Sequence, residues 1–198
     1  METWIEAAVT AARSGRLGVL TDVDGTISPL AEHPGEARVE PRAIAALAAL
    51  APRITIAGAV SGRDLDDLRR MVGLDALYYS GGHGLSWRFG ELSGHAEGAE
   101  VFAAEVEPAA SDLAGRLAGQ PVRFERKRFG LAIHYRDAAD AAAARAGVMA
   151  AVAASAAARR FAVREGARVV ELVPPLTHSA DRFLSEVLSS TAILGGGS

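Results

Sequence analysis

The stretch Leu20-Thr21-Asp22-Val23-Asp24-Gly25-Thr26 places two carboxylates directly after a short apolar run. The run at residues 17–21 has the length and composition of a buried strand, and Gly25 allows the chain to turn sharply after it. Ligand sites in open α/β sheets lie at the carboxyl ends of the strands. There, a first carboxylate can attack phosphorus as a nucleophile, and a second can protonate the leaving oxygen and later activate water.

Two other interpretations of this string stay open. Calcium-binding loops also contain an Asp-x-Asp-Gly sequence, but they carry a third Asx residue before the glycine and have helices on both sides. Here a strand is expected before the aspartates. An ordinary solvent-exposed turn is the second alternative. The string alone therefore favours a site for phosphoryl transfer and leaves both alternatives open.

Short apolar runs alternate with helical segments through the first half of the chain. We expect strands at residues 17–21, 54–60 and 76–79, and helices at residues 41–50 and 64–71. Strands that alternate with helices of this length indicate βαβ units and a parallel sheet. The pair Ser61-Gly62 follows the second strand, where a hydroxyl and N–H groups can bind an anion, although such a pair also commonly caps a helix.

The pattern changes after residue 84. From there we expect helices at residues 100–117 and 140–160, an antiparallel strand pair at 122–125 and 131–135, a strand at 168–173 and a last helix at 181–190. This block has the make-up of an inserted α/β domain. The sequence therefore predicts an α/β fold in which residues 1–84 and 176–198 form the core and residues 85–175 form the insertion.

The composition limits the classes of function. The 198 residues are 49% hydrophobic and 23% charged, values close to those of globular proteins, and the net charge is −3. That charge does not favour nucleic acid or an acidic membrane surface. The chain has no cysteine, which excludes disulfides, thiolate nucleophiles and cysteine-bound metals, and Lys127 is its single lysine.

No secretory signal and no apolar run of membrane-spanning length is found in the sequence. We therefore expect a cytoplasmic protein without nucleic-acid or membrane partners. The sequence does not determine its oligomeric state.

Six short strings together resemble the trehalose-6-phosphate phosphatases of the haloacid dehalogenase superfamily. In chain order they are Asp22-Val-Asp-Gly-Thr-Ile-Ser-Pro29, Val60-Ser-Gly-Arg63, Gly81-Gly-His-Gly84, Glu125-Arg-Lys127, His134-Tyr-Arg136 and Glu171-Leu-Val-Pro174. The resemblance implies a Rossmann-like parallel-sheet core with an inserted α/β cap, and hydrolysis of trehalose 6-phosphate through an aspartyl phosphate.

The resemblance also implies roles for residues of the core. Asp22 would be the nucleophile and Asp24 the general acid and base. Mg²⁺ would be held by the Asp22 carboxylate, the backbone carbonyl of Asp24 and an acidic residue from a late motif. Contacts to the phosphoryl group or substrate would come from Ser61, Gly62, Arg63 and His83. At the last of these loops, Gly82 stands where the family commonly has asparagine.

Five residues of the inserted domain match the positions by which the family holds the sugar: Glu125, Lys127, His134, Arg136 and Glu171. Mixed acids and bases suit a sugar ring, since its hydroxyls both donate and accept hydrogen bonds. Taken without the resemblance, residues 123–128 would be a solvated charged hairpin, and His134 would be a packed histidine.

The late motifs depart from the family pattern. The family has a Lys-Gly pair after the Glu171 strand. An ungapped alignment places Ser179 of this chain at the lysine position, and a shifted alignment places Arg182 there. The family's Gly-Asp-Asp is matched by Gly195-Gly196-Gly197, after which the given sequence ends. Loss of one positioned electrostatic group commonly lowers rates by a factor of about 10² to 10³, so we expect impaired turnover, with truncation as one explanation.

Three functions follow from these observations. The leading hypothesis is hydrolysis of trehalose 6-phosphate. The second is a phosphatase of the same superfamily that acts on another sugar phosphate. The third is a truncated, non-catalytic homologue that binds a sugar phosphate.

Overall fold

The computed structural model describes residues 6, 9, 10, 13, 17–31 and 34–176. The chain divides into two compact units, Met1–His95 and Ala96–Ser198. Each unit is described by itself. In the described part of the chain, no helix is long and apolar enough to cross a membrane.

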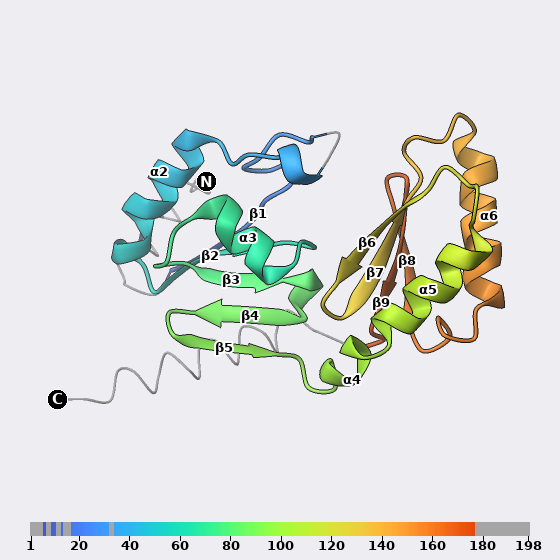
Figure 1. Cartoon of the computed structure of the whole chain (residues 1–198). Helices are drawn as coiled ribbons and strands as arrows, with labels where there is room; N and C mark the ends of the chain where they lie inside the picture. The colour runs from blue at the N-terminus through green and yellow to red at the C-terminus, as the bar shows by residue number, and fades with distance from the viewer. Residues whose placement is uncertain (1–5, 7–8, 11–12, 14–16, 32–33, 177–198) are drawn as a thin grey trace. The chain divides into compact units, whose positions relative to one another are not determined.

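The described strands of the first unit form one sheet in the order β1-β2-β3-β4-β5 (Figure 1). They are β1 (Gly18–Asp22), β2 (Ile56–Val60), β3 (Tyr78–Gly81), β4 (Ser86–Phe89) and β5 (Leu92–His95). The first three run parallel, as the alternation of strands and helices predicts, and the last two are antiparallel. Asp22 is paired with Val60, so β1 and β2 end at the same edge.

Helices α2 (Pro41–Leu50) and α3 (Leu65–Val72) connect the parallel strands, with short 3₁₀ turns at Pro34–Glu36, Ala51–Arg53 and Gly82–Gly84. Pro41 occupies the first position of α2. A backbone N–H at that position has no partner within the helix, so proline, which lacks one, costs nothing there. Leu47 of α2 and Leu68 of α3 pack on the sheet face that carries Ala57, Ala59 and Tyr79. This core fixes the edge at which the aspartates emerge.

The first sheet extends further along the sequence than expected. We placed the start of the insertion at residue 85, but β4 and β5 continue the sheet of β1 through residue 95. The hairpin turns at Gly90, whose φ of 56° suits glycine. Beyond Leu176, the predicted second part of the core, including the helix at 181–190, lies outside the described residues.

The second unit contains an antiparallel sheet in the order β6-β7-β9-β8. Its strands are β6 (Arg123–Lys127), β7 (Gly130–His134), β8 (Ala162–Gly166) and β9 (Val169–Val173), and its helices are α4 (Glu100–Ala103), α5 (Val106–Arg116) and α6 (Ala141–Ala154). Strand β7 lies in a different sheet from β1.

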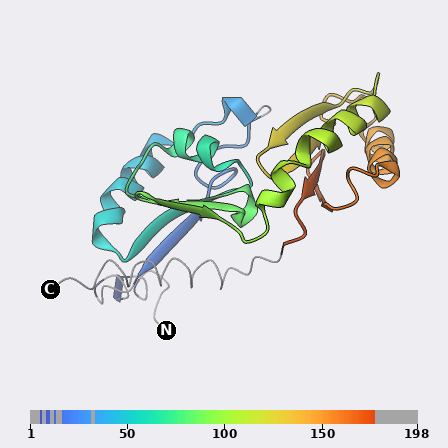
Figure 2. The ribbon, with the colours of Figure 1, turned by 60° about the horizontal axis from the view of Figure 1, so that its bottom comes forward.

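Helices α5 and α6 lie on one face of this sheet (Figure 1 and Figure 2). Leu131, Ile133, Val170 and Leu172 point to that face and are at most 1% exposed. Helix α6 begins where the Asp140 carboxylate accepts a hydrogen bond from the Ala143 amide at 2.9 Å. The opposite face of the sheet is not part of this apolar core and carries Glu125 and Lys127 of β6 and His134 of β7.

Three expectations for the second unit were wrong. The helix predicted at 140–160 ends at Ala154. The helix predicted at 100–117 is interrupted between α4 and α5. Pro108 explains the break, because a restart at Val106 puts the proline in a first turn, where its missing N–H is not needed. Strand β8 was not predicted, since Ala-Val-Arg-Glu-Gly has neither an apolar run nor a clear alternation.

Gly130 and Gly147 provide a matched test of this packing. A Cβ on Gly130 would lie 2.4 Å from the carbonyl oxygen of Leu172, whereas a Cβ on Gly147, within α6, meets nothing within 4 Å. Gly130→Ala should lower the free energy of unfolding by about 1–3 kcal/mol through overpacking, and Gly147→Ala should raise it by about 0.5–1 kcal/mol. Urea denaturation measures both. Equal effects of the two substitutions would contradict the packing of β7 on β9.

Candidate active site

Asp22 and Asp24 emerge at the carboxyl end of β1, in a tight turn. Val23 between them is fully buried, and its carbonyl accepts hydrogen bonds from the amides of Ile27 and Ser28 at 3.1 and 2.9 Å. Gly25 has a φ of 85°, which allows the reversal. Because Val23 points inward, the flanking aspartates are left toward the solvent side: Asp22 is exposed and Asp24 half-buried. Thr26 Oγ1 donates to Asp22 Oδ2 at 3.3 Å.

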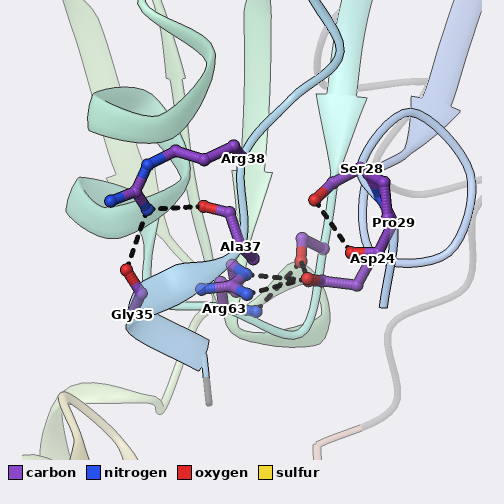
Figure 3. Close-up of polar contacts among 8 residues, drawn as sticks. Asp24, Ser28, Pro29, Gly35, Ala37, Arg38 and Arg63 are labelled. Carbon is purple, nitrogen blue, oxygen red and sulfur yellow. Dashed lines mark hydrogen bonds and ion pairs between the residues drawn. The ribbon is translucent and has the colours of Figure 1, made fainter. Parts of the chain in front are cut away.

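The loop after β2 supplies the partners of Asp24. Arg63 binds both carboxylate oxygens, with Nε 2.8 Å from Oδ2 and a terminal guanidinium nitrogen 2.7 Å from Oδ1 (Figure 3). Ser61 Oγ lies 3.5 Å from the same Oδ2 and accepts a hydrogen bond from the Arg63 amide at 3.2 Å. Ser61 is only 4% exposed. Asp24, Ser61 and Arg63 therefore form one hydrogen-bonded cluster.

The turn after β3 joins this cluster. The His83 amide donates to the Ser61 carbonyl at 3.2 Å, and the Gly82 amide donates to the Arg63 carbonyl at 2.7 Å. A Cβ on Gly62 would lie 2.5 Å from the His83 ring, so only glycine fits beneath that ring. The structure thus brings together the predicted residues of three loops in the first unit.

The second unit gathers polar residues on the sheet face opposite α5 and α6. Glu125 pairs in register with Ala132, and Ala132 with Glu171, so the two carboxylates are on the same face. Lys127 Nζ donates to Glu171 Oε1 at 2.5 Å, and His134 Nε2 lies 2.7 Å from Glu125 Oε2. These two acid–base pairs contain four of the five sugar-binding residues expected from the sequence.

Arg136 is placed differently from the other four. It follows β7, is exposed, and its carbonyl accepts a hydrogen bond from the Arg168 side chain at 3.2 Å. Two arginines that the sequence analysis did not select, Arg123 and Arg164, share the polar face, because their register partners are His134 and Glu171. Alternate residues of a strand point to the same face, so the position of Arg123 two residues before Glu125 could have placed it on this face.

The Glu125 carboxylate is stabilised in its ionised form. The pKa of Glu125 is lowered, mainly by a hydrogen bond from His134. Burial raises this pKa, while the positive charges of Lys127 and Arg123 lower it further. The other ring nitrogen of His134, Nδ1, is buried without a hydrogen-bond partner among the described residues. Glu125 is therefore an acceptor at neutral pH, with 31% of its side chain exposed.

The described residues do not complete a magnesium site. Among them there is no group of three or more His, Asp or Glu side chains placed to hold a metal ion. Asp22 offers one carboxylate and Asp24 a backbone carbonyl, while both carboxylate oxygens of Asp24 are bound by Arg63. Magnesium prefers octahedral oxygen ligation, commonly with one or two carboxylates and waters.

Solved structures with the same arrangement identify the class of fold. A trehalose-6-phosphate phosphatase related protein aligns with a TM-score of 0.70 at 18% identity, over 86% of this chain and 73% of that protein. The C-terminal domain of the Candida albicans trehalose-6-phosphate phosphatase aligns with a TM-score of 0.76 at 20% identity, over 94% and 67%. The chain thus has the Rossmann-like α/β fold of the haloacid dehalogenase type.

The sequence comparison gives the family. The trehalose-phosphatase family model matches residues 20–193, and this chain belongs to that family. Trehalose-phosphate phosphatase of Mycobacterium tuberculosis H37Rv is 39% identical over 173 residues, which cover 86% of this chain and 43% of the relative. That of Mycobacterium avium is 37% identical over 96% of this chain and 49% of the relative. The chain spans about half the length of the curated relatives it matches.

The Glu125–His134 pair predicts a measurable titration. Because the pKa of Glu125 is lowered from 4.5 in the folded protein, the stability that the pair contributes is complete above pH 4.5 and is lost as the pH falls through the lowered value. His134→Ala should return the pKa of Glu125 toward 4.5, as read from carboxyl carbon NMR shifts.

Arg126→Gln is the control for this titration. Arg126 lies next to Glu125 on β6 but binds Glu107 and lowers the pKa of that carboxyl instead. The substitution should raise the pKa of Glu107 and leave that of Glu125 unchanged. A Glu125 pKa that does not respond to His134→Ala would contradict the pairing.

Proposed function

We propose that this chain hydrolyses trehalose 6-phosphate to trehalose and inorganic phosphate through an aspartyl-phosphate intermediate. The observation that carries the proposal is the placement of two aspartates, separated by one residue, at the carboxyl end of β1 beside the Ser61–Arg63 loop that follows β2. Membership of the trehalose-phosphatase family supports the choice of substrate.

The reaction is proposed to run in two steps. In the first, an oxygen of the Asp22 carboxylate forms a bond to phosphorus while the bond from phosphorus to the sugar oxygen breaks, and Asp24 gives its proton to that oxygen. In the second, Asp24 takes a proton from water, the water oxygen attacks phosphorus, and the bond to Asp22 breaks. Phosphate leaves, and both carboxyl groups return to their starting states.

The loops around the aspartates are proposed to bind the phosphate group. Ser61 offers a buried hydroxyl, Gly62 lets the backbone come close, and Arg63 offers a planar guanidinium that can bind two oxygens at once. His83 packs on Gly62 and would face the substrate from the third loop.

The polar face of the second unit is proposed to bind the sugar, with Glu125, Lys127, His134, Arg136 and Glu171 as its contacts. The alternation of ionised acceptors and cationic donors suits hydroxyls that donate and accept. Gly130 and Ala132 on the same face keep it flat enough for a ring to approach. On this proposal, the first unit is the catalytic core and the second the cap that determines specificity.

A second candidate is a homologue that binds a sugar phosphate without hydrolysing it. The specific observation in its favour is that the described residues hold no three-ligand metal cluster. The aligned Ser179 and the Gly196-Gly197 pair, where the family has a lysine and two aspartates, lie outside the described residues. A phosphatase for a different sugar phosphate is the remaining alternative, and substrate comparison separates it from the leading proposal.

Substitution of the two aspartates tests the proposed chemistry. Asp22→Asn should abolish phosphate release from trehalose 6-phosphate, because the amide is not a nucleophile, and Asp24→Asn should nearly abolish it, because the proton carrier is lost. Asp75→Asn, which changes a fully exposed carboxylate far along the chain, should leave the rate unchanged. Unaltered release by Asp22→Asn would refute the assignment of the nucleophile.

Magnesium binding is a separate prediction. Haloacid dehalogenase phosphatases generally use this ion, and we propose that the present chain binds it weakly through the Asp22 carboxylate and the Asp24 carbonyl. Ser179→Lys adds a charge but no oxygen ligand, so it should neither tighten binding nor restore turnover. Calorimetric titration of the whole chain with magnesium measures this. Micromolar affinity would show that other residues complete the site.

A further inference from the structure

The contact between Arg63 and Asp24 conflicts with the work proposed for Asp24. Both carboxylate oxygens accept hydrogen bonds from the same guanidinium, at 2.8 and 2.7 Å. A carboxylic acid that must give a proton to a leaving oxygen needs one oxygen to carry that proton and to face the substrate. In this arrangement each oxygen already accepts a hydrogen bond from the guanidinium, and the side chain of Arg63 is only 16% exposed.

We propose that Arg63 is an exchangeable clamp: it holds Asp24 before substrate arrives and transfers its guanidinium to the phosphate group when the sugar phosphate binds. This inference rests on the proposed function and extends it by assigning Arg63 a regulatory contact in the free protein. A phosphate dianion offers the guanidinium the same two-oxygen geometry as a carboxylate with a greater negative charge. The exchange frees Asp24 at the moment when a proton is needed.

The backbone around Arg63 supports a pivot of the side chain alone. Its amide donates to Ser61 Oγ, and its carbonyl accepts from the Gly82 amide at 2.7 Å. The loop is therefore fixed at both ends of the residue, while the side chain carries the exchangeable pair. Ser61 Oγ, already 3.5 Å from Asp24, lies within the same cluster and would meet the incoming phosphate beside Arg63.

The lysine count strengthens the case for Arg63. Lys127 is the single lysine of the chain, and its ammonium binds Glu171 in the second unit at 2.5 Å. No lysine is therefore available in residues 1–95 to neutralise a bound phosphate group. Within the described residues, Arg63 is the cation that contacts the proposed proton carrier directly.

A double-mutant cycle tests the exchange with inorganic phosphate as the probe and calorimetry on the whole chain as the readout. Asp24→Asn removes the internal competitor and should tighten phosphate binding about fivefold or more, the lower range of coupling between sites. Arg63→Gln should weaken binding by a similar factor. In a protein that already carries Arg63→Gln, Asp24→Asn should increase the phosphate affinity much less, because Asp24 affects phosphate binding through the Arg63 guanidinium.

Further variants separate a clamp from simple charge effects. Arg63→Lys keeps the charge but loses the two-oxygen geometry, and should restore only part of the affinity. Arg38→Gln removes an arginine that donates to the Gly35 and Ala37 carbonyls (Figure 3), and should leave phosphate binding unchanged. Circular dichroism confirms that each variant is folded.

The outcomes distinguish this inference from the proposed function. An equal gain from Asp24→Asn in both backgrounds would mean that Asp24 only repels phosphate, and it would overturn the exchange while leaving the phosphatase proposal intact. A cycle with the predicted coupling in a chain that does not hydrolyse trehalose 6-phosphate would support the exchange and refute the hydrolytic function. Absence of phosphate binding in every variant would refute the exchange, whereas the hydrolytic function is tested by phosphate release from trehalose 6-phosphate.

Discussion

The parallel pairing of β1 with β2 brings the Asp24 turn and the Ser61–Arg63 loop together in the site of the first unit. Asp22 and Val60 are register partners, so the turns that follow them start at the same edge of the sheet. The Asp24 turn then meets the Ser61–Arg63 loop, and β3 adds the His83 turn through its pairing with β2. A slip of one residue would reverse the faces of β1 and separate these groups.

The second unit uses the alternation of its strands in a different way. One face of the β6–β9 sheet is covered by α5 and α6 and contains a closed apolar core. The other face carries two acid–base pairs that are mostly buried yet remain at the sheet surface. Each carboxylate is held by a basic side chain, which reduces the cost of ordering these side chains before a ligand binds. On the proposed function, a sugar would meet this face without a large rearrangement of its side chains.

Local sequence signals predicted much of the fold, and they selected residues that the structure brings into contact, such as Asp24 and Arg63. The apolar run before Asp22, the alternation of strands with helices and the charged pattern around Glu125 were all readable. The hairpin of β4 and β5 was missed because short strands with few apolar residues give little periodicity, and α5 restarts where Pro108 requires it. The bond between Arg63 and Asp24 joins residues 39 positions apart, so it depends on tertiary pairing and leaves no local signal.

Detection of a covalent intermediate on Asp22 tests the proposed hydrolysis most directly. The whole chain is mixed with trehalose 6-phosphate and magnesium, quenched in acid and treated with tritiated borohydride, which reduces an aspartyl phosphate to homoserine. We expect labelled homoserine at position 22 and no label after Asp22→Asn. Label on another residue, or no labelled residue at all, would contradict it.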